Sequence, residues 1–197
     1  MGVILLVAGI GLCAAWVSAL LSRKEYASTA VVGVHQAPAV CSVYDTPTRA
    51  DFEMIRSEAV LADVIATLDL NELWGKKYNH GQSLSDARIE AMLRMEIRRM
   101  RKTPFIQITV FDVDPVEAAT LANAISHSFR DFKTEEVKRL SKQGADPFDR
   151  FPRVDIVKTA VPGTQPVLPN YYLVTAMLGL GVFLTIGGIV YLKNSEA

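Results

Sequence analysis

The chain begins and ends on long apolar segments, and a mixed segment of hydrophobic and polar residues lies between them. Residues 1–22 and 171–192 contain no acidic or basic side chain. About 20 apolar residues are needed for a helix to span a hydrocarbon core. The first segment lacks the basic start and the small-residue cleavage site of a signal peptide, which favours an uncleaved anchor. The pattern predicts two terminal transmembrane helices, with a short tail at 193–197.

Between these segments the hydrophobic period changes several times. Alternating and β-branched stretches predict strands, whereas apolar residues repeating at threes and fours predict helices. The expected order is a strand at 26–34 with a continuation at 39–44, a helix at 46–70, a polar linker at 75–81, a helix at 85–101, a strand at 105–111, a helix from 115 to about 140 and a strand at 153–160. This β-α-α-β-α-β order predicts an α+β fold, with residues 23–160 as a compact α/β layer next to the membrane.

One short motif combines a strand end with a helix start. Asp114 can accept hydrogen bonds as an N-cap, Pro115 suits the first helical position, and Glu117 is placed to complete a capping box. Asp112 and Asp114 together also resemble the acidic pair with which sugar-transferring enzymes hold a metal. The helix start explains both aspartates without a metal, so we interpret the motif as a cap.

Composition and motif content point away from catalysis. The formal net charge is zero, which gives no long-range field toward nucleic acid. No phosphate-binding Gly-rich loop and no nucleophile elbow occurs in the sequence. The three histidines, His35, His80 and His127, lack the spacing of a metal pair, and Cys13 and Cys41 cannot form a disulfide within the central domain. We therefore expect no enzyme, no cofactor and no metal.

A basic cluster lies near the middle of the chain. Arg94, Arg98 and Arg101 fall on one side of the helix expected at 85–101. Such a face could contact an anionic polymer, lipid head groups or an acidic neighbour. The alternative is a solvated face whose arginines pair locally with Glu90 and Glu96.

Small residues form a second candidate feature, in the two terminal helices. They fall near one face of each helix and would let helices approach closely, either with each other or with a neighbouring copy. Small residues are also common in any membrane helix. The six positions are Gly11, Ala15, Ala19, Thr175, Gly179 and Gly187.

Residues 161–170 are rich in proline and lead directly into the second apolar segment. Pro162, Pro166 and Pro169 restrict the backbone to extended conformations, and Asn170 ends the segment. Three spaced prolines predict a semi-rigid strut rather than a hinge.

Four stretches in this order resemble the Wzz-type chain-length determinants, which are polysaccharide co-polymerases of the bacterial inner membrane. The stretches are YASTAVV from Tyr26, IRSEAVLADVIATLDL from Ile55, RKTPFIQITVFDVDPVEAATLANAI from Arg101 and VDIVKTAVPGTQPVLPN from Val154. Together with the terminal segments they cover most of the chain. The proline-rich approach to the last apolar segment is the most recognisable of the four.

The resemblance implies a function and a location. It implies a two-span inner-membrane protein with a periplasmic central domain and cytoplasmic ends, an orientation that the flanking charges alone do not choose. It implies contact with membrane lipid, a homo-oligomer, and a non-enzymatic role in setting the chain length or export of a surface polysaccharide such as lipopolysaccharide. A polysaccharide polymerase or another membrane complex would be the partner, and nucleic acid would not.

One departure from the family leaves a rival interpretation. Members usually insert a long helical region before the last strand, and here only about 20 residues, 133–152, fill that place. A kinase domain is absent too. The alternative function is therefore a structural scaffold subunit of a larger membrane complex, in which only the base of the fold remains.

Overall fold

The computed structural model describes residues 2–21, 24–35, 47–101, 103–142, 153–167 and 171–195. These residues fall into two compact units, Met1–Glu25 with Gln165–Ala197, and Tyr26–Thr164. The elements are α1 (Gly2–Leu21), β1 (Tyr26–His35), α2 (Arg49–Ile55), α3 (Glu58–Thr67), α4 (Leu70–Tyr78), α5 (Asp86–Met92), β2 (Arg94–Arg99), β3 (Phe105–Asp112), α6 (Pro115–Lys142), β4 (Arg153–Lys158) and α8 (Tyr171–Ser195).

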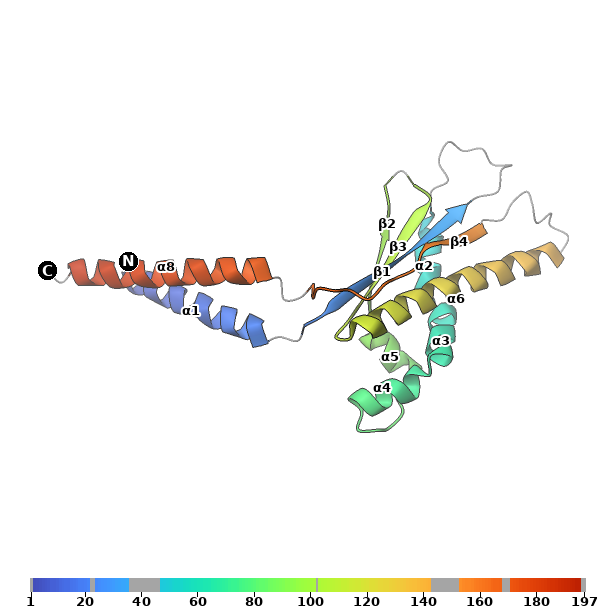
Figure 1. The fold of residues 1–197 in the computed structure, drawn as a ribbon, viewed down its shortest axis with the longest axis horizontal. Coiled ribbons are helices and arrows are strands. Elements are labelled where there is room, and N and C mark those ends of the chain that lie inside the picture. Colours follow the sequence, from blue (N-terminus) through green and yellow to red (C-terminus); the bar gives the residue numbers. More distant parts are fainter. Residues whose placement is uncertain are drawn as a thin grey trace. The chain divides into compact units, whose positions relative to one another are not determined.

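The central unit is an antiparallel sheet with helices packed on it (Figure 1). The strand order is β2-β3-β1-β4, so β1 lies between β3 and the last strand. Helix α6 runs along one face of the sheet and contacts β1, β3 and β4, and α3 packs on α6. This is the split β-α-β arrangement of two crossover units, which buries one face of an antiparallel sheet.

The core lies between the sheet and α6. Alternate side chains of a strand point to opposite faces, and the inward set of β3 is fully buried at Ile106, Ile108 and Val110. Ile125 and Phe129 of α6 are equally buried against them. Burial of such side chains contributes about 1.5–3 kcal/mol each relative to exposure, so this layer holds the unit together.

Residues 85–101 form a short helix and a strand, and not one helix as predicted. A single helix was expected there, but α5 ends at Met92 and Arg94–Arg99 form the edge strand β2. Strand β2 pairs with β3 from Arg94↔Phe111 to Arg99↔Ile106. Met95 and Ile97 alternate onto the core side, so pairing and burial on β3 override the helical spacing.

Two other boundaries also differ from the expectation. The helix expected at 46–70 is two helices, because Ser57 adopts an extended backbone and caps α3 through Val60 N–H. The linker expected at 75–81 lies largely inside α4, which begins after Asp69 in the left-handed region, at a φ of 50°. The strand expected at 39–44 lies outside the described residues.

Within the described residues, no helix contains a stretch long and apolar enough to cross a membrane. The expected terminal transmembrane helices were therefore wrong, and so was the inner-membrane, two-span localisation that rested on them.

The terminal unit is instead described by the packing of α1 on α8. The helices approach closely at Gly9, where an added Cβ would collide with Thr185 and lie 2.8 Å from the carbonyl oxygen of Gly181. An added Cβ on Gly181 would in turn lie 3.1 Å from Cys13 Sγ. The two helices thus meet at glycines because no larger residue fits there.

The segment after β4 is fixed to α6 by one side chain. The amide of Asn123 donates to the carbonyl oxygen of Ala160 at 3.0 Å, and its Oδ1 accepts from the backbone N–H of Ala160 at 2.7 Å. Asn123 therefore replaces the strand partner that Ala160 lacks among the described residues. It positions the start of the proline-rich segment.

Replacing Asn123 with alanine should lower the free energy of unfolding by about 1–3 kcal/mol, because both backbone groups of Ala160 lose their partner. Urea denaturation followed by circular dichroism measures this. Asn79, which makes one exposed side-chain bond to Gln82, provides the control, and its alanine variant should change stability by less than about 0.5 kcal/mol. Equal effects of the two variants would contradict the anchoring role.

Candidate functional site

A groove lies between α4 and the first turns of α6, with a volume of about 710 Å³. Leu70 and Leu121 at its base are buried, whereas Leu73 and Val116 on its walls are 50% and 59% exposed. Exposed apolar side chains rimmed by charge are typical of contact surfaces. The residues of this α4–α6 groove are Leu68, Leu70, Leu73, Lys76, Lys77, Asp114, Val116, Glu117, Thr120 and Leu121.

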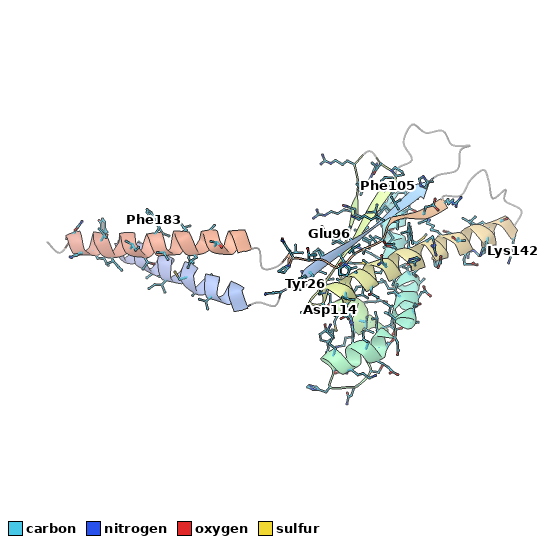
Figure 2. All side chains as sticks on the ribbon, in the orientation of Figure 1. Tyr26, Glu96, Phe105, Asp114, Lys142 and Phe183 are labelled. Carbon is cyan, nitrogen blue, oxygen red and sulfur yellow. The ribbon has the colours of Figure 1, made fainter. Side chains whose placement is uncertain are left out.

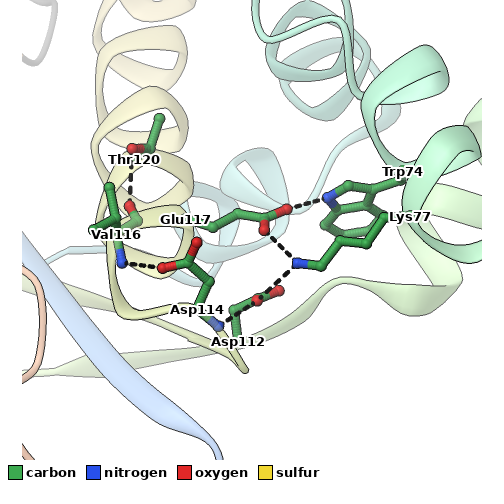
Figure 3. Close-up of polar contacts among 7 residues, drawn as sticks. All are labelled: Trp74, Lys77, Asp112, Asp114, Val116, Glu117 and Thr120. Carbon is green, nitrogen blue, oxygen red and sulfur yellow. Dashed lines mark hydrogen bonds and ion pairs between the residues drawn. The ribbon is translucent and has the colours of Figure 1, made fainter.

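The start of α6 forms one side of the groove (Figure 3). Asp114 Oδ1 accepts a hydrogen bond from the N–H of Val116 at 2.9 Å, and the N–H of Asp114 donates to Asp112 Oδ1 at 2.9 Å. The cap predicted at Asp114 is confirmed. The two aspartates are held in the turn by backbone donors, as the cap interpretation requires.

The predicted capping box was wrong, since the carboxylate of Glu117 faces α4 (Figure 3). Glu117 accepts hydrogen bonds from Trp74 Nε1 and from Lys77 Nζ, the latter at 2.5 Å. Lys77 Nζ also lies 3.6 Å from Asp112 Oδ1. The side chain of Glu117 is only 14% exposed. Two donors across the groove, one of them charged, stabilise its carboxylate more than the backbone N–H at its own helix end would.

Two opposing influences set the protonation of Lys77. Burial by itself lowers the pKa of Lys77, but hydrogen bonds to Glu117 and Tyr78 and the negative charges of Asp112 and Glu117 raise this pKa above its ordinary value. Lys77 therefore stays charged across the whole physiological range. Lys77 and Glu117 therefore form an ion pair in the lining of the groove.

The sequence did not single out Trp74 or Lys77. Trp74 directly precedes the predicted polar linker at 75–81 and Lys77 lies within it, and Trp74 is 3% exposed. Their partner Glu117 is 43 residues from Trp74 along the chain. The sequence did contain one signal for this contact, a tryptophan close to two lysines. A tryptophan that becomes buried needs an acceptor for its indole N–H.

The arginines of the basic cluster lie on β2 and just beyond it. Arg94 and Arg98 are exposed and share one face of the strand, and Arg101 follows in the turn. Arg98 Nε lies 2.7 Å from Glu96 Oε1, which agrees with the local pairing considered from the sequence. Arg94 Cζ lies 5.9 Å from the centre of the Phe111 ring.

The small residues of the terminal helices are not brought together. Gly11, Gly179 and Gly187 are exposed and have no neighbour within 4 Å of an added Cβ. Ala15 and Thr175 are also exposed in this unit. The intramolecular contact uses Gly9 and Gly181, so a contact of the six predicted positions with a neighbouring copy stays a prediction. The side chain of Ala19 lies outside the described set.

The proline-rich segment is described as far as Val167. Pro162 and Pro166 lie in irregular backbone, and the N–H of Val167 donates to the carbonyl oxygen of Glu25 at 2.7 Å. Pro169 and Asn170 lie outside the described residues. The strut therefore stays a prediction.

The remaining candidate groups do not converge. His35 Nε2 is 4.0 Å from Asp155 Oδ2, His80 lies in a turn with a φ of 51°, and His127 is exposed on α6. Within the described ranges no group of three or more His, Cys, Asp or Glu side chains could hold a metal ion. The sequence matches no protein-family model and no curated protein.

Proposed function

We propose that this chain is a non-enzymatic protein that regulates the chain length or export of a surface polysaccharide and acts as a homo-oligomer. The proposal starts from the resemblance to the polysaccharide co-polymerases. The observation that supports it best is the way the four resembling stretches pack. They supply β1, α3, β3 with the start of α6, and β4, which pack together in the central unit as a sheet covered by α6 and α3.

The α4–α6 groove is where we place the contact between copies. The second side of this contact is placed toward the other end of α6, where Phe132 is 38% exposed and lines a hollow with Glu135, Glu136 and Arg139. Phe132 would enter the apolar groove of a neighbour, and the two glutamates would face its Lys76. Because the two surfaces are different, the contact is head-to-tail and generates a ring if the rotation closes.

Two substitutions test this contact from its two sides. Leu73→Asp in the groove and Phe132→Asp on α6 should each reduce the purified full-length protein to smaller species, because each places a charge in an apolar contact. Mass measurement of the native protein gives the result. Ala87→Asp, at an exposed position on α5, is the control and should leave the assembly intact. A wild-type protein that is monomeric would contradict the homo-oligomer.

The second candidate function is a scaffold subunit that docks on another protein. The short connection between α6 and β4 favours it, since little chain remains there to build a polymer-engaging extension. The two functions differ in what happens when the gene is deleted. A regulator requires the length distribution of the surface polysaccharide to change, whereas a scaffold of an unrelated complex leaves it unchanged. Electrophoresis of the extracted polysaccharide distinguishes them.

A further inference from the structure

The sheet of the central unit has one face that α6 does not cover. The side chains of β3 that point away from α6 are Phe105, Gln107, Thr109 and Phe111, and all four are partly exposed. Among the described residues, α6 is the helix in contact with the sheet strands, and it packs on the opposite, fully buried set. Figure 2 shows side chains standing off the sheet on both of its sides.

The strand register determines which side chains are neighbours on this uncovered face. Phe111 pairs with Arg94 on one side and with Ala27 on the other. Gln107 is opposite Arg98 in the same way. Glu96, between the two arginines, is opposite Thr109. Directly opposed side chains on one face are neighbours, so Arg94, Glu96 and Arg98 line a row of aromatic and hydrogen-bonding groups.

Two threonines form a polar pair in the middle of this face. Thr29 and Thr109 are paired across β1 and β3, and their hydroxyl oxygens are 2.9 Å apart. Next to this row, Phe105 pairs with Gly33, where an added Cβ would lie 3.0 Å from His35 Nε2 and 3.4 Å from the phenylalanine ring.

The two arginines present guanidinium groups to this surface. Arg94 lies over the Phe111 ring, and the side chain of Arg98 is 70% exposed while its Nε contacts Glu96. A guanidinium group has five donors in a planar fork that matches a carboxylate. An arginine held at Nε by Glu96 is pre-oriented to present its terminal amino groups outward.

We propose that this face binds an acidic polysaccharide, one whose sugar units carry carboxylates. Arg94 and Arg98 bind the carboxylates, the rings of Phe105 and Phe111 pack against the C–H faces of sugar rings, and Gln107 hydrogen-bonds to hydroxyl groups. The inference deepens the proposed function, on which it rests, by naming the ligand class and the surface that receives it.

Two other occupants fit the same face less well. Nucleic-acid-binding domains are typically strongly basic, with a pI above about 9, whereas this chain has a pI of about 6.8 and no net charge. A second copy stacked on the face would take the guanidinium group of Arg94 and the Arg98–Glu96 ion pair out of water, and desolvating charged groups is costly. A carboxylated polymer leaves this face in water and presents acceptors to both guanidinium groups along its whole length.

The test is direct binding of the full-length protein to fluorescently labelled polygalacturonate, measured by anisotropy, with neutral dextran and single-stranded DNA of matched length as comparison probes. The variant is Arg94→Gln with Arg98→Gln. The matched control is Arg49→Gln with Arg88→Gln, which removes the same charge from exposed positions on α2 and α5. Circular dichroism confirms that both variants are folded, and native mass measurement records their oligomeric state.

We expect polygalacturonate to bind the wild type and the control alike, more weakly as salt is raised, and at least about tenfold more weakly to the Arg94/Arg98 variant. Equal affinity of the two variants, absence of polygalacturonate binding, or tighter binding of the DNA overturns the proposal. A change in oligomeric state at unchanged affinity also overturns it, in favour of a contact between copies. Because binding is measured on the purified protein, its outcome is separate from that of the gene deletion.

Discussion

Replacing Lys133 with methionine is expected to lower the free energy of unfolding of the central unit by about 3–5 kcal/mol. The side chain of Lys133 is 10% exposed on α6, and its Nζ lies 3.3 Å from Oδ1 of Asp51, whose side chain is 5% exposed. Asp51 Oδ2 also accepts hydrogen bonds from the N–H and the hydroxyl of Thr48, which starts α2. Removing the lysine leaves a buried carboxylate without its counter-charge.

Urea denaturation of this variant is best carried out as a double-mutant cycle. Asp51→Asn keeps an acceptor for Thr48 but removes the charge, so adding it to Lys133→Met should recover part of the lost stability. Lys138→Met is the control, because Lys138 is 61% exposed and its Nζ lies 2.6 Å from Oε1 of Glu135, which is also exposed. This variant should lower the free energy of unfolding by less than about 1 kcal/mol. If Lys133→Met and Lys138→Met lower the free energy of unfolding equally, the buried Lys133–Asp51 pair does not hold α2 on α6.

The second large effect is expected at Glu117. Replacing Glu117 with alanine should lower the free energy of unfolding by about 2–4 kcal/mol, since the buried indole N–H of Trp74 and the ammonium group of Lys77 both lose this acceptor. Glu117→Gln should cost less, because its amide oxygen can still accept from Trp74. Glu135→Ala, on the exposed side of the same helix, should stay within about 0.5 kcal/mol of the wild type.

The effect of Glu117 should also have a defined pH dependence. The pKa of Lys77 is raised in the folded protein, and a raised pKa stabilises the fold at any pH below the unfolded value. This contribution is lost only as the pH rises through the folded value. The stability difference between wild type and Glu117→Gln should therefore be constant around neutrality and narrow under strongly alkaline conditions. A difference that already narrows below neutrality would point to another group.

The parts of the fold that the sequence predicted well are those with a clear local signal. The strand at 105–111 alternates strictly, and the helix after Asp114 has both a cap and a long apolar stripe; β3 and α6 occur at these places. Strand β2 was missed for a physical reason. Met92, Leu93 and Ile97 fit a helical spacing, and only pairing with β3, which the local pattern does not contain, makes Arg94–Arg99 a strand.

The groove and the uncovered sheet face depend on contacts between distant residues. Trp74 and Glu117 meet because α3 and α4 return the chain to the start of α6. Arg94 was correctly grouped with Arg98, but the grouping was attributed to a helix side and not to a strand face. The basic cluster could therefore be found from residue type alone. That Phe111 and Gln107 lie beside it follows only from the register of the sheet.

The most direct test of the proposed function is the length distribution of the surface polysaccharide in cells whose only copy of the gene encodes Leu73→Asp. The account predicts the same altered distribution as in the deletion strain, because the variant folds but does not assemble, and a wild-type distribution with the Ala87→Asp control. A wild-type distribution in the deletion strain itself would contradict the account.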